Sequence, residues 1–109
     1  MSKIDLSEKI ERLEAFEERH AVRIEGASAW FEYNELSVLS ELHPRTGTTI
    51  GKDLKVVAAA YNSKGQIIAK GEEYCMAESF WGFAVCECYV GEIPLKEISK
   101  IKLYPTALR

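Results

Sequence analysis

From residue 21 onward the sequence alternates apolar and polar residues over short stretches that end in turn-forming residues. Successive side chains of a β-strand point to opposite faces, so a period of two predicts strands that bury one face. The chain after His20 is therefore predicted to consist mainly of strands. In the stretch from Phe83 to Val90, one face would carry Phe83, Val85, Glu87 and Tyr89, and the other Ala84, Cys86, Cys88 and Val90.

The stretch from Leu54 to Tyr61 is almost continuously apolar and is predicted to be a central strand. Residues 62–65, Asn-Ser-Lys-Gly, supply a hairpin turn, after which residues 66–70 return antiparallel. Further strands are predicted within residues 21–33, with Gly26 as a break or bulge, and within 36–42 and 98–104. Six or seven short strands without intervening helices favour a mainly β chain, folded as an antiparallel immunoglobulin-like β-sandwich. A half-open barrel is the alternative, because strand number alone does not separate the two.

The first 20 residues follow a different pattern. Apolar residues recur at helical spacing among charged ones, and Asp5 with Glu8 matches a capping box. The sequence therefore predicts an amphipathic helix from Leu6 to His20, whose apolar stripe consists of Leu6, Ile10, Leu13 and Phe16. Two parts are expected: residues 1–20 as a helix packed on the domain or on a partner, and residues 21–109 as the β-sandwich. Packing on its own sheet is favoured over pairing with a second copy.

The hairpin at Leu54 to Ile68, with Tyr61-Asn62 before its turn, resembles the central hairpin of the FxLYD family of small bacterial immunoglobulin-like domains. Ala58 and Ala60 stand where that family has Phe and Leu. The resemblance extends over roughly residues 36–104, since the later strands follow in similar order and spacing. It implies a sandwich fold and no established reaction, and it transfers no catalytic residue.

Composition excludes several classes of function. The 109 residues suit one domain, and a net charge of -3 with scattered Lys and Arg gives no basic patch for nucleic acid. No apolar run is long enough to span a membrane, and the N-terminal residues lack the apolar segment of a secretory signal. The odd number of cysteines, three, favours reduced thiols. We therefore expect a cytoplasmic protein that binds neither membrane nor nucleic acid and needs no cofactor.

The cysteines give one candidate for chemistry. Cys86 and Cys88 lie two residues apart on a predicted strand, so both thiols would face the same way and offer two ligands to a soft metal ion. A zinc site needs four ligands, so Cys75 and a histidine, His20 or His43, would have to converge with them. Small buried residues on the inward face are the favoured interpretation.

The segment from Phe80 to Phe83 is the candidate binding surface. Phe80, Trp81 and Phe83 either fill the core, which is favoured, or form an exposed apolar site anchored by Trp81. Nothing in the sequence places a histidine beside a nucleophile, so an enzyme is not expected. The leading hypothesis is a non-enzymatic protein-interaction or assembly module that binds a protein partner or a second copy of itself. The alternative is a small-ligand or metal-binding protein that uses Cys86, Cys88 and Cys75.

Overall fold

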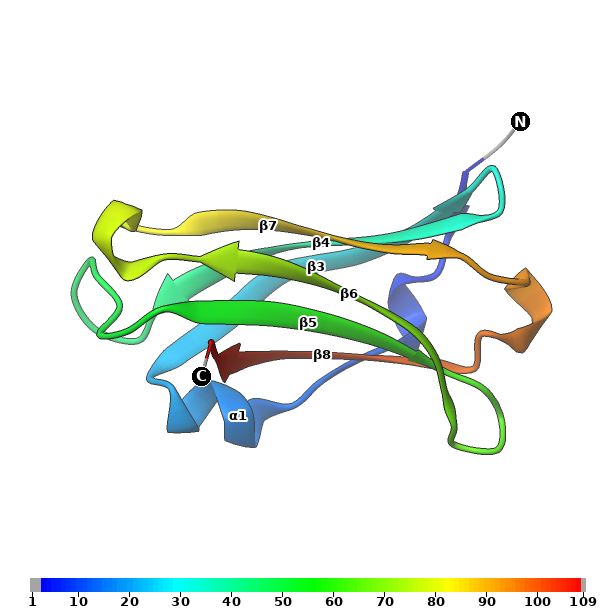
Figure 1. Cartoon of the computed structure of the whole chain (residues 1–109), viewed down its shortest axis with the longest axis horizontal. Coiled ribbons are helices and arrows are strands. Elements are labelled where there is room, and N and C mark those ends of the chain that lie inside the picture. Colours follow the sequence, from blue (N-terminus) through cyan, green and yellow to red (C-terminus); the bar gives the residue numbers. More distant parts are fainter. Residues whose placement is uncertain (1–2, 109) are drawn as a thin grey trace.

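The structure is a computed structural model, and it describes residues 3–108. These residues form two facing four-stranded sheets (Figure 1). Sheet A has the order β1-β3-β4-β7, with the bounds Ile4–Asp5, Val22–Glu32, Glu35–Pro44 and Ala84–Glu92. Sheet B has the order β2-β8-β5-β6, with the bounds Ile10–Arg12, Lys100–Ala107, Leu54–Tyr61 and Ile67–Cys75. The predicted mainly β architecture is thus confirmed.

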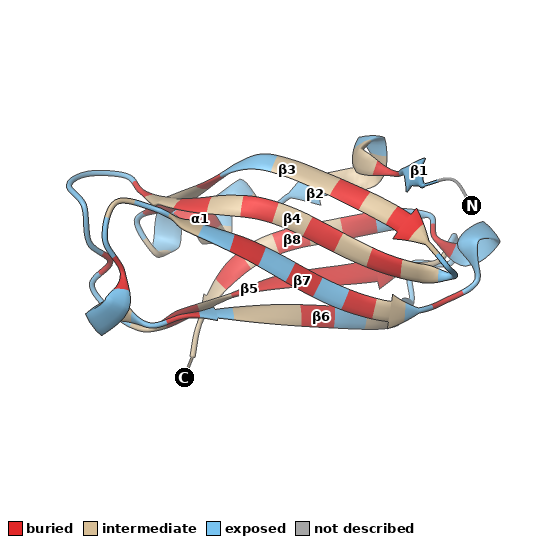
Figure 2. Cartoon of the chain, turned by 90° about the horizontal axis from the view of Figure 1, so that it is seen from above, coloured by how far each residue is buried: buried red, intermediate tan, exposed pale blue. Residues whose placement is uncertain are grey.

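Alternating burial along the strands places the core between the two sheets. In β4 each second residue from Leu36 to Pro44 is buried, whereas the residues between them are half-buried. Figure 2 shows the same alternation as bands along β3, β4 and β7. The period of two in the sequence therefore predicts correctly which face of sheet A is buried.

Two local features predicted from the sequence are confirmed. Gly26 has a φ of +63°, and the β3–β4 register shifts between Glu25 and Ser28, so this glycine marks a bulge. In the β5–β6 hairpin the side-chain carbonyl of Asn62 accepts the backbone N–H groups of Lys64 and Gln66. Asn side chains in turns form such local hydrogen bonds, so the residue types alone predict the turn at residues 62–65.

The predicted helix from Leu6 to His20 is wrong over its first half. That half forms a 3-10 turn at Ser7–Lys9 and β2, with β1 directly before it, and the α-helix α1 covers only Glu14–Arg19. β1 pairs antiparallel with β3, and β2 pairs parallel with β8, so this segment crosses from one sheet to the other. Leu6 lies in the core between the sheets. Sheet edges that offer hydrogen-bond partners outweigh the weak preference of a short isolated helix.

On the opposite side of the sandwich, β6 and β7 approach closely (Figure 1). A Cβ added at Gly71 of β6 would lie 2.2 Å from the carbonyl oxygen of Tyr89 in β7. Real side chains do not tolerate that separation, so a residue without a Cβ is required at this position. Glycine at position 71 therefore sets how closely the two sheets meet at this edge.

Two further 3-10 turns lie outside the sheets, η2 at Ala77–Ser79 and η3 at Leu95–Glu97, and α1 packs against β3 and β8. In the described part of the chain, none of the helices has the length and apolar content that crossing a bilayer requires.

Candidate functional site

The three aromatic residues of the predicted binding segment separate in the structure. Phe80 is buried in the core, whereas Trp81 is 75% exposed and Phe83 is 50% exposed. The loop between them is fixed, because Gly82 adopts a φ of +83° and its N–H donates to the carbonyl of Thr48 at 2.7 Å. Both interpretations of the segment therefore apply, Phe80 as a core residue and the other two as surface residues.

The exposed apolar surface continues along the outer face of β7. Val85 is 66% exposed and Tyr89 is 55% exposed, and both share the face of Phe83 because they follow it at even spacing. We call Trp81, Phe83, Val85 and Tyr89 the β7 strip. Val85 and Tyr89 stand on β7, which is hydrogen-bonded to β4, and Trp81 and Phe83 flank Gly82, whose N–H is bonded to Thr48.

Carboxylates line the β7 strip. Glu87 lies within it, and Glu41 of β4 stands directly opposite Val85. Glu35 accepts a hydrogen bond from the Tyr89 hydroxyl, which raises the pKa of that phenol. The strip is therefore an apolar surface with an acidic border.

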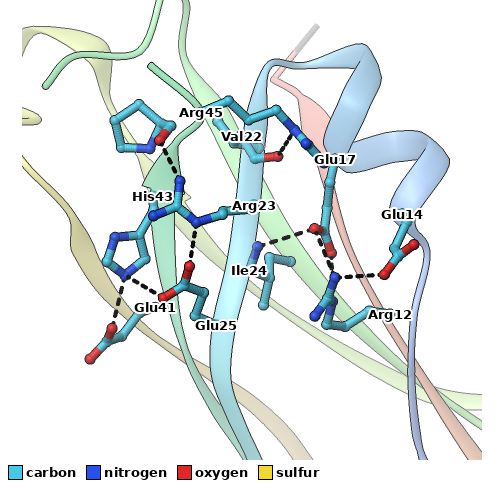
Figure 3. A network of polar contacts seen from close by, with 11 residues as sticks. Arg12, Glu14, Glu17, Val22, Arg23, Ile24, Glu25, Glu41, His43 and Arg45 are labelled. Atoms are coloured by element: carbon cyan, nitrogen blue, oxygen red, sulfur yellow. Dashed lines mark hydrogen bonds and ion pairs between the residues drawn. The ribbon is translucent and has the colours of Figure 1, made fainter. Parts of the chain in front are cut away.

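A polar cluster adjoins the strip where β3 and β4 pair (Figure 3). The Nε2 atom of His43 lies 2.9 Å from Oε1 of Glu41 and 3.6 Å from Oε1 of Glu25. The His43 ring stacks on Phe83, with centroids 5.2 Å apart and an interplanar angle of 9°. The three polar side chains share one face because Glu25 pairs with Glu41, and His43 follows Glu41 by two residues. We call Glu25, Glu41 and His43 the β3–β4 trio.

Arg23 holds one member of the trio from the side. Its Nε donates to Oε2 of Glu25, and its Nη1 donates to the carbonyl of Pro44 at 3.1 Å. The hydrogen bond from Arg23 lowers the pKa of Glu25, with a smaller electrostatic contribution from His43. The arginine thus occupies Oε2 of Glu25, while Oε1 faces His43.

A second polar network in Figure 3 is structural. Glu17 of α1 is fully buried, and its carboxylate pairs with Nε of Arg12 at 3.0 Å. The N–H of Ile24 donates to the other oxygen of Glu17 at 3.3 Å. The amphipathic helix predicted from Leu6 to His20 places charged residues such as Glu17 in solvent, and for Glu17 this prediction is wrong. Its oxygens are occupied by these bonds, which tie α1 and β2 to β3.

The cysteines lie on the inner side of the sandwich. Cys75, Cys86 and Cys88 are all buried and free, as the inward-face interpretation predicted. The Sγ atoms of Cys75 and Cys86 are 3.5 Å apart, and the Cys88 thiol donates to the carbonyl of Val56 at 3.3 Å. Burial raises the pKa of Cys88 to about 12, and the hydrogen bond with Cys75 raises the pKa of Cys86. The raised pKa values favour the protonated form of Cys86 and Cys88, and a thiol is a poorer metal ligand than a thiolate.

The structure does not bring the predicted metal ligands together. The cysteines point into the core, whereas His43 lies on the outer face of sheet A. Among the residues described, the trio of Glu25, Glu41 and His43 has ligand atoms within 4.8 Å of one another, and the three cysteines form no such group. Sequence reasoning missed this trio, because its members come from two strands.

Comparisons with protein-family models, with curated proteins and with solved structures found no match to this chain. The candidate functional site is the outer face of sheet A. It offers a fixed apolar strip, an acidic border, and a cluster of two carboxylates with an imidazole.

Proposed function

We propose that this protein is a non-enzymatic binding module whose β7 strip docks a protein segment that carries apolar side chains beside basic ones. The observation that carries the proposal is the exposure of Val85 and Tyr89 on the outer face of β7, together with that of Trp81 and Phe83 in the loop directly before it. Trp and Tyr dominate the binding energy of protein interfaces, and they act best when a rigid scaffold presents them. The strip combines both conditions.

The acidic border favours a basic partner over a second copy of the chain. In a symmetric dimer the same patch meets itself, so the acidic border that contains Glu41 and Glu87 would face a second acidic border. Like charges placed together across an interface are unfavourable, whereas Lys or Arg on a different protein would complement them. We therefore assign the strip to a heterologous partner, and self-association is an outcome of the test.

The proposed fold class is an immunoglobulin-like sandwich. When β3, β4, β5, β7 and β8 are aligned with strands A, B, C, E and F of that fold, A, B and E share one sheet and C and F share the other. β6 pairs with the C equivalent, and β2 occupies the place of strand G beside the F equivalent. This order supports the resemblance to FxLYD domains as a proposal. The free, buried cysteines support a reducing compartment, so we extend the proposal to a cytoplasmic location.

The test begins with a photo-cross-linking residue at position 85, which captures and identifies the partner. The partner is then purified by itself, and its binding to the full chain is measured by titration. Trp81→Ala is expected to weaken binding by about thirtyfold, since a central aromatic contributes about 2 kcal/mol or more. Glu87→Lys is expected to weaken binding and to reduce its dependence on salt. Ile67→Ser is the matched control, because Ile67 is 59% exposed on β6 of the other sheet.

The proposal fails if Trp81→Ala binds the cross-linked protein as tightly as the original chain, or if Ile67→Ser weakens binding equally. It also fails if the cross-linked species is a second copy and light scattering shows a dimer that Trp81→Ala dissociates. Loss of binding in Trp81→Ala with retention in Ile67→Ser supports it.

A further inference from the structure

We propose that Glu25, Glu41 and His43 form a binding site for a single divalent metal ion of the zinc class on the outer face of sheet A. The site is separate from the cysteines, which are the alternative metal ligands considered from the sequence. It uses two carboxylates and one imidazole, a ligand set that suits Zn²⁺ and leaves one position of a tetrahedral ion for water.

The spacing of the ligand atoms matches a common ion. Bonds of about 2.0–2.2 Å at tetrahedral or right angles place neighbouring ligand atoms about 2.8–3.6 Å apart. The Nε2 atom of His43 lies 2.9 Å from Oε1 of Glu41 and 3.6 Å from Oε1 of Glu25. All three ligand atoms lie within 4.8 Å of one another. Small side-chain rotations therefore suffice to bring them onto one ion, without movement of the strands.

The backbone fixes the three residues in this arrangement. Glu25 and Glu41 are direct partners in the β3–β4 ladder, and His43 is two residues along β4 on the same face. Two carboxylates directly opposite each other on neighbouring strands repel unless a cation lies between them. The imidazole of His43 reaches both carboxylates and Arg23 pairs with Glu25, and a divalent ion between the two carboxylates would add two positive charges at that point.

Neighbouring side chains hold two of the ligands in position. Phe83 stacks on the His43 ring and limits its rotation, and Arg23 binds the Oε2 atom of Glu25 rather than the Oε1 atom that faces His43. Supporting contacts of this kind orient ligands in metal sites and contribute to affinity. Phe83 and Arg23 thus hold two of the three ligands of the trio in place.

The experiment is a calorimetric titration of the full chain with Zn²⁺ in a buffer that contains a non-chelating reductant. A single site is expected. The variants Glu25→Gln, Glu41→Gln and His43→Gln should each weaken binding by about tenfold or more, because a lost ligand costs at least as much as a lost supporting contact. The matched controls are Glu87→Gln, which removes a nearby carboxylate of the same face, and His20→Gln, which removes the other histidine. Both should bind Zn²⁺ as the original chain does.

Two spectroscopic measurements distinguish the trio from the thiols. Co²⁺ bound to the trio should show no sulfur-to-metal charge-transfer band, and Mn²⁺ should broaden amide resonances around residues 25, 41 and 43 in the folded chain. Circular dichroism of each variant confirms that it is folded. No Zn²⁺ binding by the original chain would overturn the proposal, as would a thiolate band or affinity unchanged by all three substitutions. Because the metal alone is the probe, this result is independent of whether the β7 strip binds a protein.

Discussion

Replacing Gly71 with alanine tests how closely β6 and β7 pack. The added Cβ would lie 2.2 Å from the oxygen and 2.6 Å from the carbon of the Tyr89 carbonyl, and 3.1 Å from the nitrogen of Val90. These are backbone atoms, so no side-chain rotation relieves the overlap. β6 must instead move away from β7 by about 1.3 Å to restore ordinary contact, since dispersion contacts between heavy atoms are optimal at about 3.5–4.0 Å.

The size of the effect follows from that displacement. Forcing one extra carbon into a well-packed core costs about 1–3 kcal/mol. A gap of about 0.5–1 Å already removes about a quarter to a half of the attractive energy of each dispersion contact along it. We therefore place Gly71→Ala in the upper part of the range of about 1–3 kcal/mol. We expect Gly71→Ala to lower the free energy of unfolding by about 2–3 kcal/mol, against a total of about 5–15 kcal/mol for a domain.

Urea unfolding, followed by fluorescence and by circular dichroism, measures the change. Gly51→Ala is the matched control, because a Cβ at Gly51 meets nothing within 4 Å. The control should stay within about 0.5 kcal/mol of the original chain. If Gly71→Ala is equally stable, the close approach of β6 to β7 is not a constraint on the fold, and the packing argument is refuted.

Three further predictions concern buried charge, thiol protonation and the exposed strip. Arg12→Met should destabilise the fold by about 2 kcal/mol, because it leaves the buried carboxylate of Glu17 without its cation. This loss is smaller than the roughly 3–5 kcal/mol for breaking a fully buried ion pair, since the Arg12 side chain is 38% exposed. Burial raises the pKa of Cys88 from 9.0 to about 12, so its contribution to stability is complete below pH 9.0 and is lost as the pH rises toward about 12. Cys88→Ala should therefore show a flatter decline of unfolding free energy over that interval. Trp81→Ala should change the unfolding free energy by no more than about 0.5 kcal/mol, because Trp81 is 75% exposed.

Each of these three predictions is contradicted by a specific result. Unchanged stability of Arg12→Met in urea would mean that Glu17 is solvated in solution. A decline between pH 9 and pH 12 that is as steep in Cys88→Ala as in the original chain would remove Cys88 as a contributor. A strongly destabilised Trp81→Ala would mean that Trp81 packs on the domain and does not belong to an exposed strip.

The local features of the fold could be predicted from the sequence, because local chemistry causes them. Alternation along β4 and β7 predicts which side chains enter the core. Asn62 closes its turn with its own side chain, and Gly26 permits the positive φ of a bulge. Each of these depends on residues close together in the chain, so residue type and spacing suffice.

The N-terminal segment shows where local pattern fails. Leu6 and Ile10 are four residues apart, a spacing that places them on one side of a helix and also on one face of a strand. The choice between the two depended on the unpaired edges of β3 and β8, which accept β1 and β2. Those edges exist only after the two sheets have formed, so the sequence pattern alone did not contain the answer.

Residue types and their spacing were sufficient to predict short strands, the positions of their turns, and the apolar face of most strands. The burial of Phe80 next to an exposed Trp81, and the contact of His43 with Glu25 and Glu41, could be learned only from the folded chain. Exposure and convergence depend on which strands become neighbours and in which register they pair. Glu25 lies 16 positions from Glu41 in the chain, and the two meet only because β3 pairs with β4 in this register.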